Sequence, residues 1–410
     1  MKNFRLGVGW ICLGLCICPL PIAVEAASIT PIARVSALGG QYFTGQTHSS
    51  GANVDVSLVP VVTFSPRLHL IPIYIGTYNQ TQSVYNFLGE NTLINKQLDH
   101  TGVLRLSWGV SSAWRLKPRV GYKREWIQQS SDGSLAGGLF NYHRTFYGLS
   151  AERVLSNGLF EFGYEFGQTR YPNYQSLDAD PRLTSTGITS GAGVDVLNFN
   201  THELSLIHQW ATADKEWSLN HRLTWLRENF QDQNVITADS GGFEAFTSQK
   251  RHDDILNLSL QQTWRPSTRW TFGLGENVQD YLSNQNAFDA TQLFVNPYTY
   301  RYYNFFEVSG TPSITRFYKE GRWETTLAGN FGFRKYAHRR TQDGTGTYQD
   351  QLIYSAFRGA TITLRYHFTK GLSAVLTGSV LTYWSNTRYE ANYPYNYTTA
   401  SYLGGLSWEY

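Results

Sequence analysis

The residues best suited to acid–base chemistry in this sequence are His252 and the two aspartates that follow it, Asp253 and Asp254. An imidazole beside a carboxylate can activate a water molecule, so this trio could act as a general base. A second His/Asp pair stands in the segment LDH at 98–100. A histidine among acidic residues is more often solvated surface, however, and the chain contains no G-x-S-x-G motif. We therefore expect no enzyme activity.

A second set of candidates is charged and recurs at alternate positions. Basic members gather between residues 101 and 128, and acidic members between 143 and 171. Opposed rows of charge would orient polar solutes and filter them, whereas mutually compensating ion pairs would only fill the inside of a hollow fold. Both interpretations stay open. The members are Arg105, Lys117, Arg119, Lys123, Glu125, Glu152, Glu161, Glu165, Glu203, Arg222, Glu307, Glu324, Arg334 and Arg365.

Period-two alternation identifies the elements that carry these charges. In FEFGYEF at 160–166, aromatic residues alternate with glutamate and glycine, and in ATITLRYHF at 360–368, apolar residues alternate with polar ones. Aromatic residues make up 15% of the chain, yet its mean hydropathy is −0.35. Strands with one apolar and one polar face, in a chain of this composition, are typical of a transmembrane β-barrel.

Short turn signals set the expected number of strands. Seven of them, from SPR at 65–67 to KG at 370–371, recur roughly every 50 residues, and longer Gly/Ser/Asn-rich stretches lie midway between them. Each repeat offers two long strands, not the four short strands of a soluble β-propeller, the main rival fold. Seven short turns and eight long loops require 16 strands.

We therefore expect an all-β fold: a single-chain antiparallel transmembrane barrel of about 16 strands, with short periplasmic turns and long extracellular loops. The expected strands are 29–44, 53–64, 68–79, 101–111, 116–128, 143–155, 159–171, 201–212, 217–230, 252–264, 270–282, 301–317, 323–337, 354–368, 372–385 and 399–410.

The first 26 residues are expected to be a cleaved signal peptide, and residues 27–410 the barrel. Lys2 and Arg5 precede an apolar stretch that ends in VEA at 24–26. All three cysteines and the one methionine lie in this segment. The remaining chain would hold no sulfur, which excludes disulfides, thiolate metal sites and iron–sulfur clusters. Because no other ligand set stands out, we expect neither a metal nor a cofactor.

Tryptophans follow several of the short turns, namely Trp217, Trp270 and Trp323. An amphipathic indole is most favourable where lipid meets water, so we expect these residues and Trp408 to form an aromatic girdle at the periplasmic interface.

The last segment, YLGGLSWEY, places Tyr402, Leu406, Trp408 and Tyr410 on one face of a strand. Here the chain resembles the bacterial outer-membrane β-barrel superfamily, and specifically its porin-like sixteen-stranded barrels. Members of the superfamily end in an aromatic-terminated strand that the barrel-assembly machinery reads. The resemblance covers the whole of 27–410, and Tyr410 replaces the more usual phenylalanine. It implies the outer membrane of a Gram-negative bacterium, with outer-membrane lipid, lipopolysaccharide and the assembly machinery as partners.

General porins narrow their lumen with an inward-folded third loop, but the segment from Gln129 lacks the acidic Pro-Glu-Phe-Gly-Gly motif of that loop. The fourth loop, at 172–200, is longer and could fold inward with Asp178, Asp180 and Arg182 at its tip. The alternative is a surface loop in contact with solvent or lipopolysaccharide.

The expected function is a porin-like channel for passive or selective diffusion of small polar or charged solutes. A rival hypothesis is an export conduit for a polysaccharide, which would need inward aromatic residues, and the expected register provides few. A barrel that sheathes a cytochrome is a third candidate, and a surface receptor that binds through its loops is a fourth. The net charge of 27–410, +2 from 32 basic and 30 acidic residues, gives no reason to expect a nucleic-acid partner. The sequence leaves a homo-oligomer open.

Overall fold

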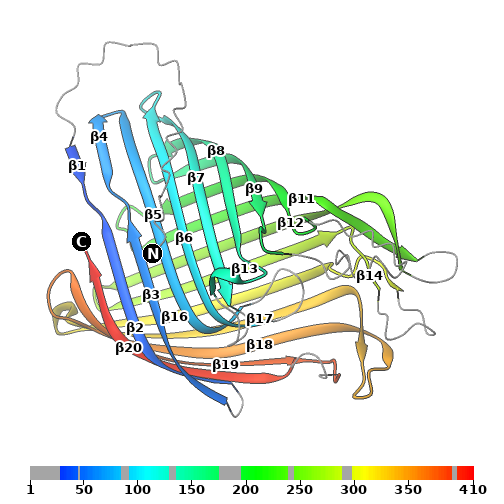
Figure 1. The fold of residues 1–410 in the computed structure, drawn as a ribbon. Coiled ribbons are helices and arrows are strands. Elements are labelled where there is room, and N and C mark those ends of the chain that lie inside the picture. The colour runs from blue at the N-terminus through cyan, green and yellow to red at the C-terminus, as the bar shows by residue number, and fades with distance from the viewer. Residues whose placement is uncertain are drawn as a thin grey trace, which may run out of the picture.

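The computed structural model describes residues 28–44, 47–84, 92–128, 135–174, 195–238, 244–288, 298–389 and 395–410. In these residues the chain forms one antiparallel sheet in which each strand pairs with its neighbours in sequence (Figure 1). Strand β20 (Tyr397–Glu409) pairs with β2 (Ala33–Thr44), so the sheet closes on itself. The expected closed barrel of 16 strands is confirmed.

Two of the sixteen strands are interrupted by a proline. β1 (Ser28–Thr30) leads into β2 across Pro31, and β3 (Thr47–Leu58) leads into β4 (Val61–Ser65) across Pro60. Proline has no N–H to give to a ladder, so each strand breaks there and resumes.

The other barrel strands are β5 (Leu68–Val84), β6 (Thr92–Gly109), β7 (Trp114–Gln128), β8 (Tyr142–Leu155), β9 (Gly158–Arg170), β10 (Phe199–Ala211), β11 (Trp217–Ala238), β12 (Glu244–Ser267), β13 (Trp270–Ser283), β16 (Phe305–Tyr318), β17 (Trp323–Gln342), β18 (Tyr348–His367) and β19 (Leu372–Ser385). A small hairpin, β14 (Ala287–Phe288) with β15 (Tyr298–Thr299), lies outside the barrel sheet.

Four expected long loops are shorter than expected, because the strands on either side continue into them. β5 continues to Val84 and β6 starts at Thr92, and β11 continues to Ala238 and β12 starts at Glu244. β3 begins at Thr47, not at residue 53, and Thr44 pairs directly with Thr47. β17 continues to Gln342 and β18 starts at Tyr348, so the polar segment RTQDGTGTYQDQ is largely strand. Beyond the apolar zone a strand needs no apolar face, so the alternation that identified the strands stops before the strands do.

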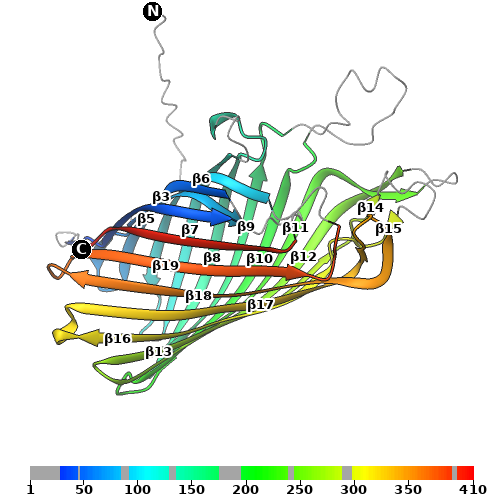
Figure 2. The ribbon, with the colours of Figure 1, turned by 90° about the horizontal axis from the view of Figure 1, so that it is seen from below.

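The alternation separates the two faces of the barrel. On the outside, large apolar side chains lie open: Phe162 is 56% exposed, Leu376 54% and Ile362 48%. Their sequence neighbours Glu161, Val375 and Thr363 point to the inside, where successive strands present mainly hydroxyl, amide and charged groups. In Figure 2, β17–β19 pass in front of β8–β10, on the other side of the ring.

Local hydrogen bonds shape the tight turns. Between β10 and β11, Asp214 accepts from the Thr212 hydroxyl and, at 3.0 Å, from the Glu216 backbone N–H. These bonds, the Thr212 one foremost, hold the pKa of the Asp214 carboxyl below its usual range. Among the described residues, no helix is long and apolar enough to cross a membrane.

Candidate functional site

Charged side chains of β6–β9 form an ion-pair ladder on the inner wall. Lys117 Nζ lies 2.7 Å from Glu161 Oε2 and also pairs with Glu152. Arg119 Nη2 lies 2.7 Å from Glu165 Oε2. The other bonds of the ladder join Arg115 to Glu152, Arg144 to Glu165, and Lys123 to both Asp99 and Glu125, at 2.8–2.9 Å.

Glycines between the partners make these contacts possible. Arg119 on β7 lies opposite Gly148 on β8, and Gly148 lies opposite Glu165 on β9. A Cβ on Gly148 would stand 2.8 Å from Arg119 Nε. The missing side chain therefore lets the guanidinium reach across one strand to its carboxylate.

The ladder decides between the two interpretations of the charged residues. Its basic and acidic rows are neighbours on one wall and neutralise each other, instead of facing each other across the lumen. Elsewhere, Arg222 pairs with Glu203 at 3.0 Å, Arg334 with Glu307 at 2.6 Å, and Arg365 with Glu324 at 3.9 Å. Arg105 lies opposite Arg119 and has no carboxylate partner among the described residues. The geometry favours compensated ion pairs over a transverse field.

Removing carboxylates from the ladder should convert the wall to a net positive surface. In the double variant Glu152→Gln/Glu161→Gln, Lys117 loses both of its partners. We expect the chloride-to-potassium permeability ratio to rise roughly two- to fivefold, since uncompensated charge on a pore wall selects ions. The reversal potential across a KCl gradient measures this ratio. Glu276→Gln, which removes a carboxylate from the outer face of β13, is the matched control and should leave the potential unchanged; equal shifts in both variants would refute the assignment.

Part of the wall beyond the ladder carries uncharged amides. Gln209 on β10, Asn220 on β11 and Gln261 on β12 stand in one register row, which we call the amide row. The row opens into a hollow of about 410 Å³, also lined by Ser218 and Thr263. Within the described part of the chain, no side-chain hydrogen bond engages any of these three amides. Their donors and acceptors are available to water or solute.

Hydroxyl groups continue this neutral surface on the side of the barrel that faces the ladder. Thr315 and Thr326 are joined at 2.8 Å, Thr363 and Thr377 at 3.1 Å, and Ser379 and Ser401 at 2.8 Å. These strands, β16–β20, lie about half a turn of the ring from β7–β9. The lumen is therefore lined by paired charges and by uncharged polar groups.

The expectation of few inward aromatic residues is wrong. Toward the loop end of the wall, Tyr281 stacks on Phe305 at 5.1 Å, and Phe305 packs against Tyr336 at 5.8 Å. Other inward rings pack in the same way on strands to either side around the barrel. Phe199 on β10 lies against Phe230 on β11 at 5.2 Å, and Tyr383 on β19 against Tyr397 on β20 at 4.7 Å. Tyr281, Phe305, Tyr336, Ile255 and Ile353 form one buried cluster. These residues pack on one another, so little of each ring faces the lumen.

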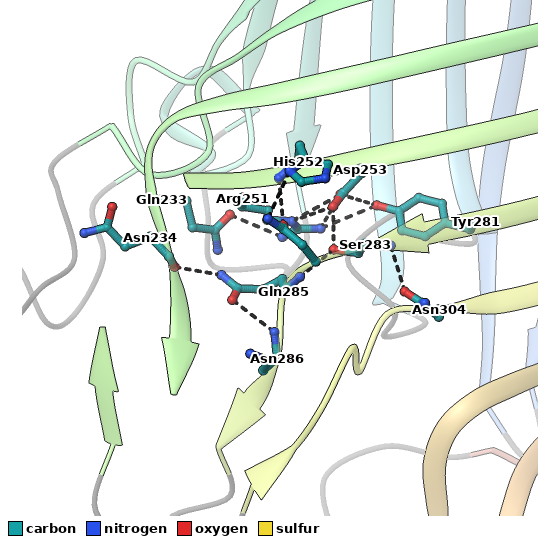
Figure 3. Close-up of polar contacts among 11 residues, drawn as sticks. Gln233, Asn234, Arg251, His252, Asp253, Tyr281, Ser283, Gln285, Asn286 and Asn304 are labelled. Atoms are coloured by element: carbon teal, nitrogen blue, oxygen red, sulfur yellow. Dashed lines mark hydrogen bonds and ion pairs between the residues drawn. The ribbon is translucent and has the colours of Figure 1, made fainter. Parts of the chain in front are cut away.

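A buried charge pair lies next to this cluster (Figure 3). The Arg251 and Asp253 side chains are 2% and 0% exposed, and Arg251 Nη2 lies 2.6 Å from Asp253 Oδ2. The hydroxyls of Tyr281 and Ser283 each donate to Asp253 at 2.5 Å. The Arg251 guanidinium also lies 4.4 Å from the centre of the Phe230 ring. Every polar group of this pair is thus matched inside the wall.

The segment after β13 joins the buried charge pair to the C-terminal end of β11 through hydrogen bonds. Gln285 Oε1 accepts from the Ile236 backbone N–H at 2.9 Å, and Asn286 Nδ2 donates to the Ile236 carbonyl at 2.6 Å. Gln285 and Asn286 are themselves buried. The sequence suggests a different role for Asp253 and gives no indication of the rest of the cluster, because its amides and arginine are typical of loops.

Strand alternation separates each candidate histidine from the aspartate next to it, whereas Asp254 stays on the same outer face as His252. His252 points away from buried Asp253 and contacts Asn284 Nδ2 through its Nδ1 at 3.0 Å. His100 likewise contacts the Tyr74 hydroxyl on the outer face, whereas Asp99 pairs with Lys123 inside. Neither histidine can form a dyad with its adjacent aspartate. In the described ranges, no three His, Cys, Asp or Glu side chains gather where they could hold a metal ion.

The outer face carries an aromatic belt at the turn end. Trp217, Trp323 and Trp408 are 42–43% exposed there, and Trp270 begins β13 on the same face. Trp217 stacks on Trp264 at 5.5 Å. A closed sheet that exposes apolar side chains above such a belt satisfies its own backbone and needs lipid around it. The chain is a closed sixteen-stranded β-barrel with the two faces of a transmembrane barrel.

No family model and no curated protein matches this chain. Among solved structures it is similar to a bacterial polysaccharide outer membrane secretin (9% identity, TM-score 0.44, 93% of this chain and 98% of that one). It is also similar to in-vitro folded OmpT of Vibrio cholerae in its trimer form (8%, 0.46, 94% and 100%) and to a triple mutant of the Rhodopseudomonas blastica porin (12%, 0.39, 93% and 100%). Similarities this low carry no argument about activity.

The remaining candidate residues divide into two groups. In the last strand of the barrel, Tyr402 and Leu406 lie on the outer face with Trp408, and the Tyr410 backbone N–H donates to the Ala33 carbonyl at 2.8 Å. Residues 1–26 and the loop tip with Asp178, Asp180 and Arg182 lie outside the described residues.

Proposed function

We propose that this barrel is a porin-like channel for passive diffusion of small polar solutes across the outer membrane. The observation that carries the proposal is the inner wall, which is polar around the ring at mid-height and most of whose charges are paired. A barrel of 16 strands has room for an aqueous channel.

The wall chemistry also supports a weak preference for uncharged solutes. An ion entering the lumen meets paired carboxylates and cations, so it gains little from either sign. A neutral hydroxylated solute finds unengaged amides in the amide row and hydroxyls on the facing strands. We infer a channel with low ion selectivity and a weak preference for neutral polar solutes.

Conductance of the refolded protein in a planar bilayer tests this proposal. We expect open steps that grow with KCl concentration and a reversal potential within about 10 mV of zero across a tenfold gradient, because the wall charges are compensated. Proteoliposomes should also swell in an isotonic solution of a small neutral sugar. A barrel that inserts and stays silent in both assays would contradict the proposal.

An export conduit for a polysaccharide remains the second candidate. The inward aromatic cluster favours it, because sugar chains stack on aromatic rings, but the clustered rings are mostly buried against one another. Block of the ion current by a long neutral oligosaccharide separates the two candidates. A conduit binds the oligosaccharide in its lumen, which interrupts the current. A diffusion channel excludes the oligosaccharide, and its current continues without interruption.

Catalysis has less support. His252 and His100 lie on the opposite side of their strands from Asp253 and Asp99. Asp254 shares the outer face with His252, but its carboxylate lies near Arg227 and, among the described residues, makes no hydrogen bond with the histidine, so we propose transport and not an enzyme activity.

A further inference from the structure

The outer face of β6–β9 carries four basic residues in a single register row. His100 on β6 lies opposite Arg124 on β7, Arg124 opposite His143 on β8, and His143 opposite Arg170 on β9. We call these four residues the basic row. The four strands lie side by side in Figure 1, coloured from cyan to green. At about 4.8 Å between strands, the row spans about 14 Å of the barrel surface.

The basic row has no acidic partners, in contrast to the inner wall of the same strands. Inward Lys117, Arg119 and Lys123 each contact a carboxylate within 2.8 Å. The outward positions described on β6–β9 include no Asp or Glu, and neither Arg124 nor Arg170 makes an ion pair there. Positive charge left uncompensated at an apolar surface is costly unless an external anion neutralises it.

Neighbouring groups hold the basic row in place. The Arg124 guanidinium lies 4.6 Å from the centre of the Trp126 ring and remains exposed. Arg170 Nη1 donates to the Thr169 carbonyl at 2.9 Å, and the Tyr74 hydroxyl lies 2.7 Å from His100 Nδ1. The side chains are therefore positioned before any ligand arrives.

The height of the row matches the outer leaflet headgroups. Trp114 begins β7 at the turn end, and Arg124 stands ten residues further along the strand. At about 3.3 Å per residue and a tilt near 40°, these ten residues rise about 25 Å, the height of the apolar band. The basic row thus lies where the band ends and phosphorylated headgroups begin.

We propose that the basic row binds the phosphate groups of outer-leaflet lipopolysaccharide. An arginine guanidinium group can donate two parallel hydrogen bonds to two oxygens of one phosphate. His143, between the two arginines, and His100, beside Arg124, add further N–H donors. The aromatic neighbours Tyr74, Tyr122 and Trp126 supply the interfacial surface on which the saccharide part of the headgroup rests. This site lies on the outside of the barrel and does not depend on what passes through the lumen.

Titration of the refolded full-length protein in neutral detergent with lipopolysaccharide tests this site. The Arg124→Gln/Arg170→Gln variant should bind it at least about tenfold more weakly, because two cations that contact phosphate are removed. The matched control is Lys335→Gln/Arg358→Gln, which removes two outward cations from β17 and β18 and should change affinity less than about twofold. Heat-modifiable mobility on gels confirms that both variants are folded barrels.

The ligand is varied in the same assay. Dephosphorylated lipopolysaccharide should bind the unmodified protein as weakly as the intact form binds the Arg124/Arg170 variant. Competition by millimolar inorganic phosphate as strong as that by lipopolysaccharide would show a site for the free anion and overturn the lipid assignment. Equal losses in the two double variants, or equal binding of the dephosphorylated form, would overturn the site itself.

Discussion

Substitution of Gly405 by alanine is expected to destabilise the barrel by about 3 kcal/mol or more, since an inserted methyl group with no room forces backbone shifts. Gly405 lies on β20, at the seam where β20 pairs with β2. A Cβ at this position would fall on the backbone oxygen of Ala37, far inside van der Waals contact. That oxygen belongs to the paired backbone of the seam and cannot move aside as a flexible side chain would. Gly40 has the same relation to the Tyr402 oxygen.

The adjacent glycine provides a matched control. A Cβ on Gly404 would meet nothing closer than Leu376 Cδ1 at 3.6 Å, which is ordinary contact. Gly404→Ala should therefore leave the urea midpoint of unfolding in lipid vesicles nearly unchanged, as followed by tryptophan fluorescence. If both alanine variants unfold at the same urea concentration, the seam is less tightly packed than the structure indicates.

Replacement of Asp253 by alanine should cost about 3–5 kcal/mol of unfolding free energy, because it leaves the Arg251 guanidinium buried without its counter-charge. The pair is almost fully enclosed, and the hydroxyls of Tyr281 and Ser283 lose their acceptor at the same time. Urea unfolding in vesicles measures the loss.

Two further variants identify the cause. Asp254→Ala removes the next carboxylate in sequence, which lies on the outer face 4.0 Å from Arg227, and should cost less than about 1 kcal/mol. Arg251→Met/Asp253→Leu removes both charges and should recover most of the stability, since an apolar pair of similar volume replaces the buried ions. A double variant as unstable as Asp253→Ala would show that packing, and not the stranded charge, explains the effect.

The fold could be predicted from the sequence because the membrane imposes a simple rule on each strand. Residues 160–166 and 360–368 alternate because one face meets lipid and the other meets water. The strand ends could not be predicted in the same way. Residues 47–52 and 338–342 are polar on both faces and suggest a loop, yet backbone pairing continues through them.

The interior was less predictable than the outside. The list of inward charged residues drawn from the sequence omitted Asp99 and Arg144, which the structure places in the ladder. The sequence also did not show that Lys117 reaches Glu161 across β8, because register and the space left by glycines decide such contacts. Tyr281, Phe305 and Tyr336 broke the rule that inward residues are polar. They face inward because each packs against the next, and their strands come together only in the closed sheet.

The pairing of β2 with β20 has a consequence for biogenesis. Residue 34 lies beside residue 409, so the last ladder joins the two most distant parts of the sheet and can form only after every other strand is available. Contacts of such long sequence separation form slowly. Until then the growing sheet has two free edges, each a row of unsatisfied amides that would attract other chains or stall in hydrocarbon. We expect a chaperone or insertase to shield both edges until the final hairpin arrives.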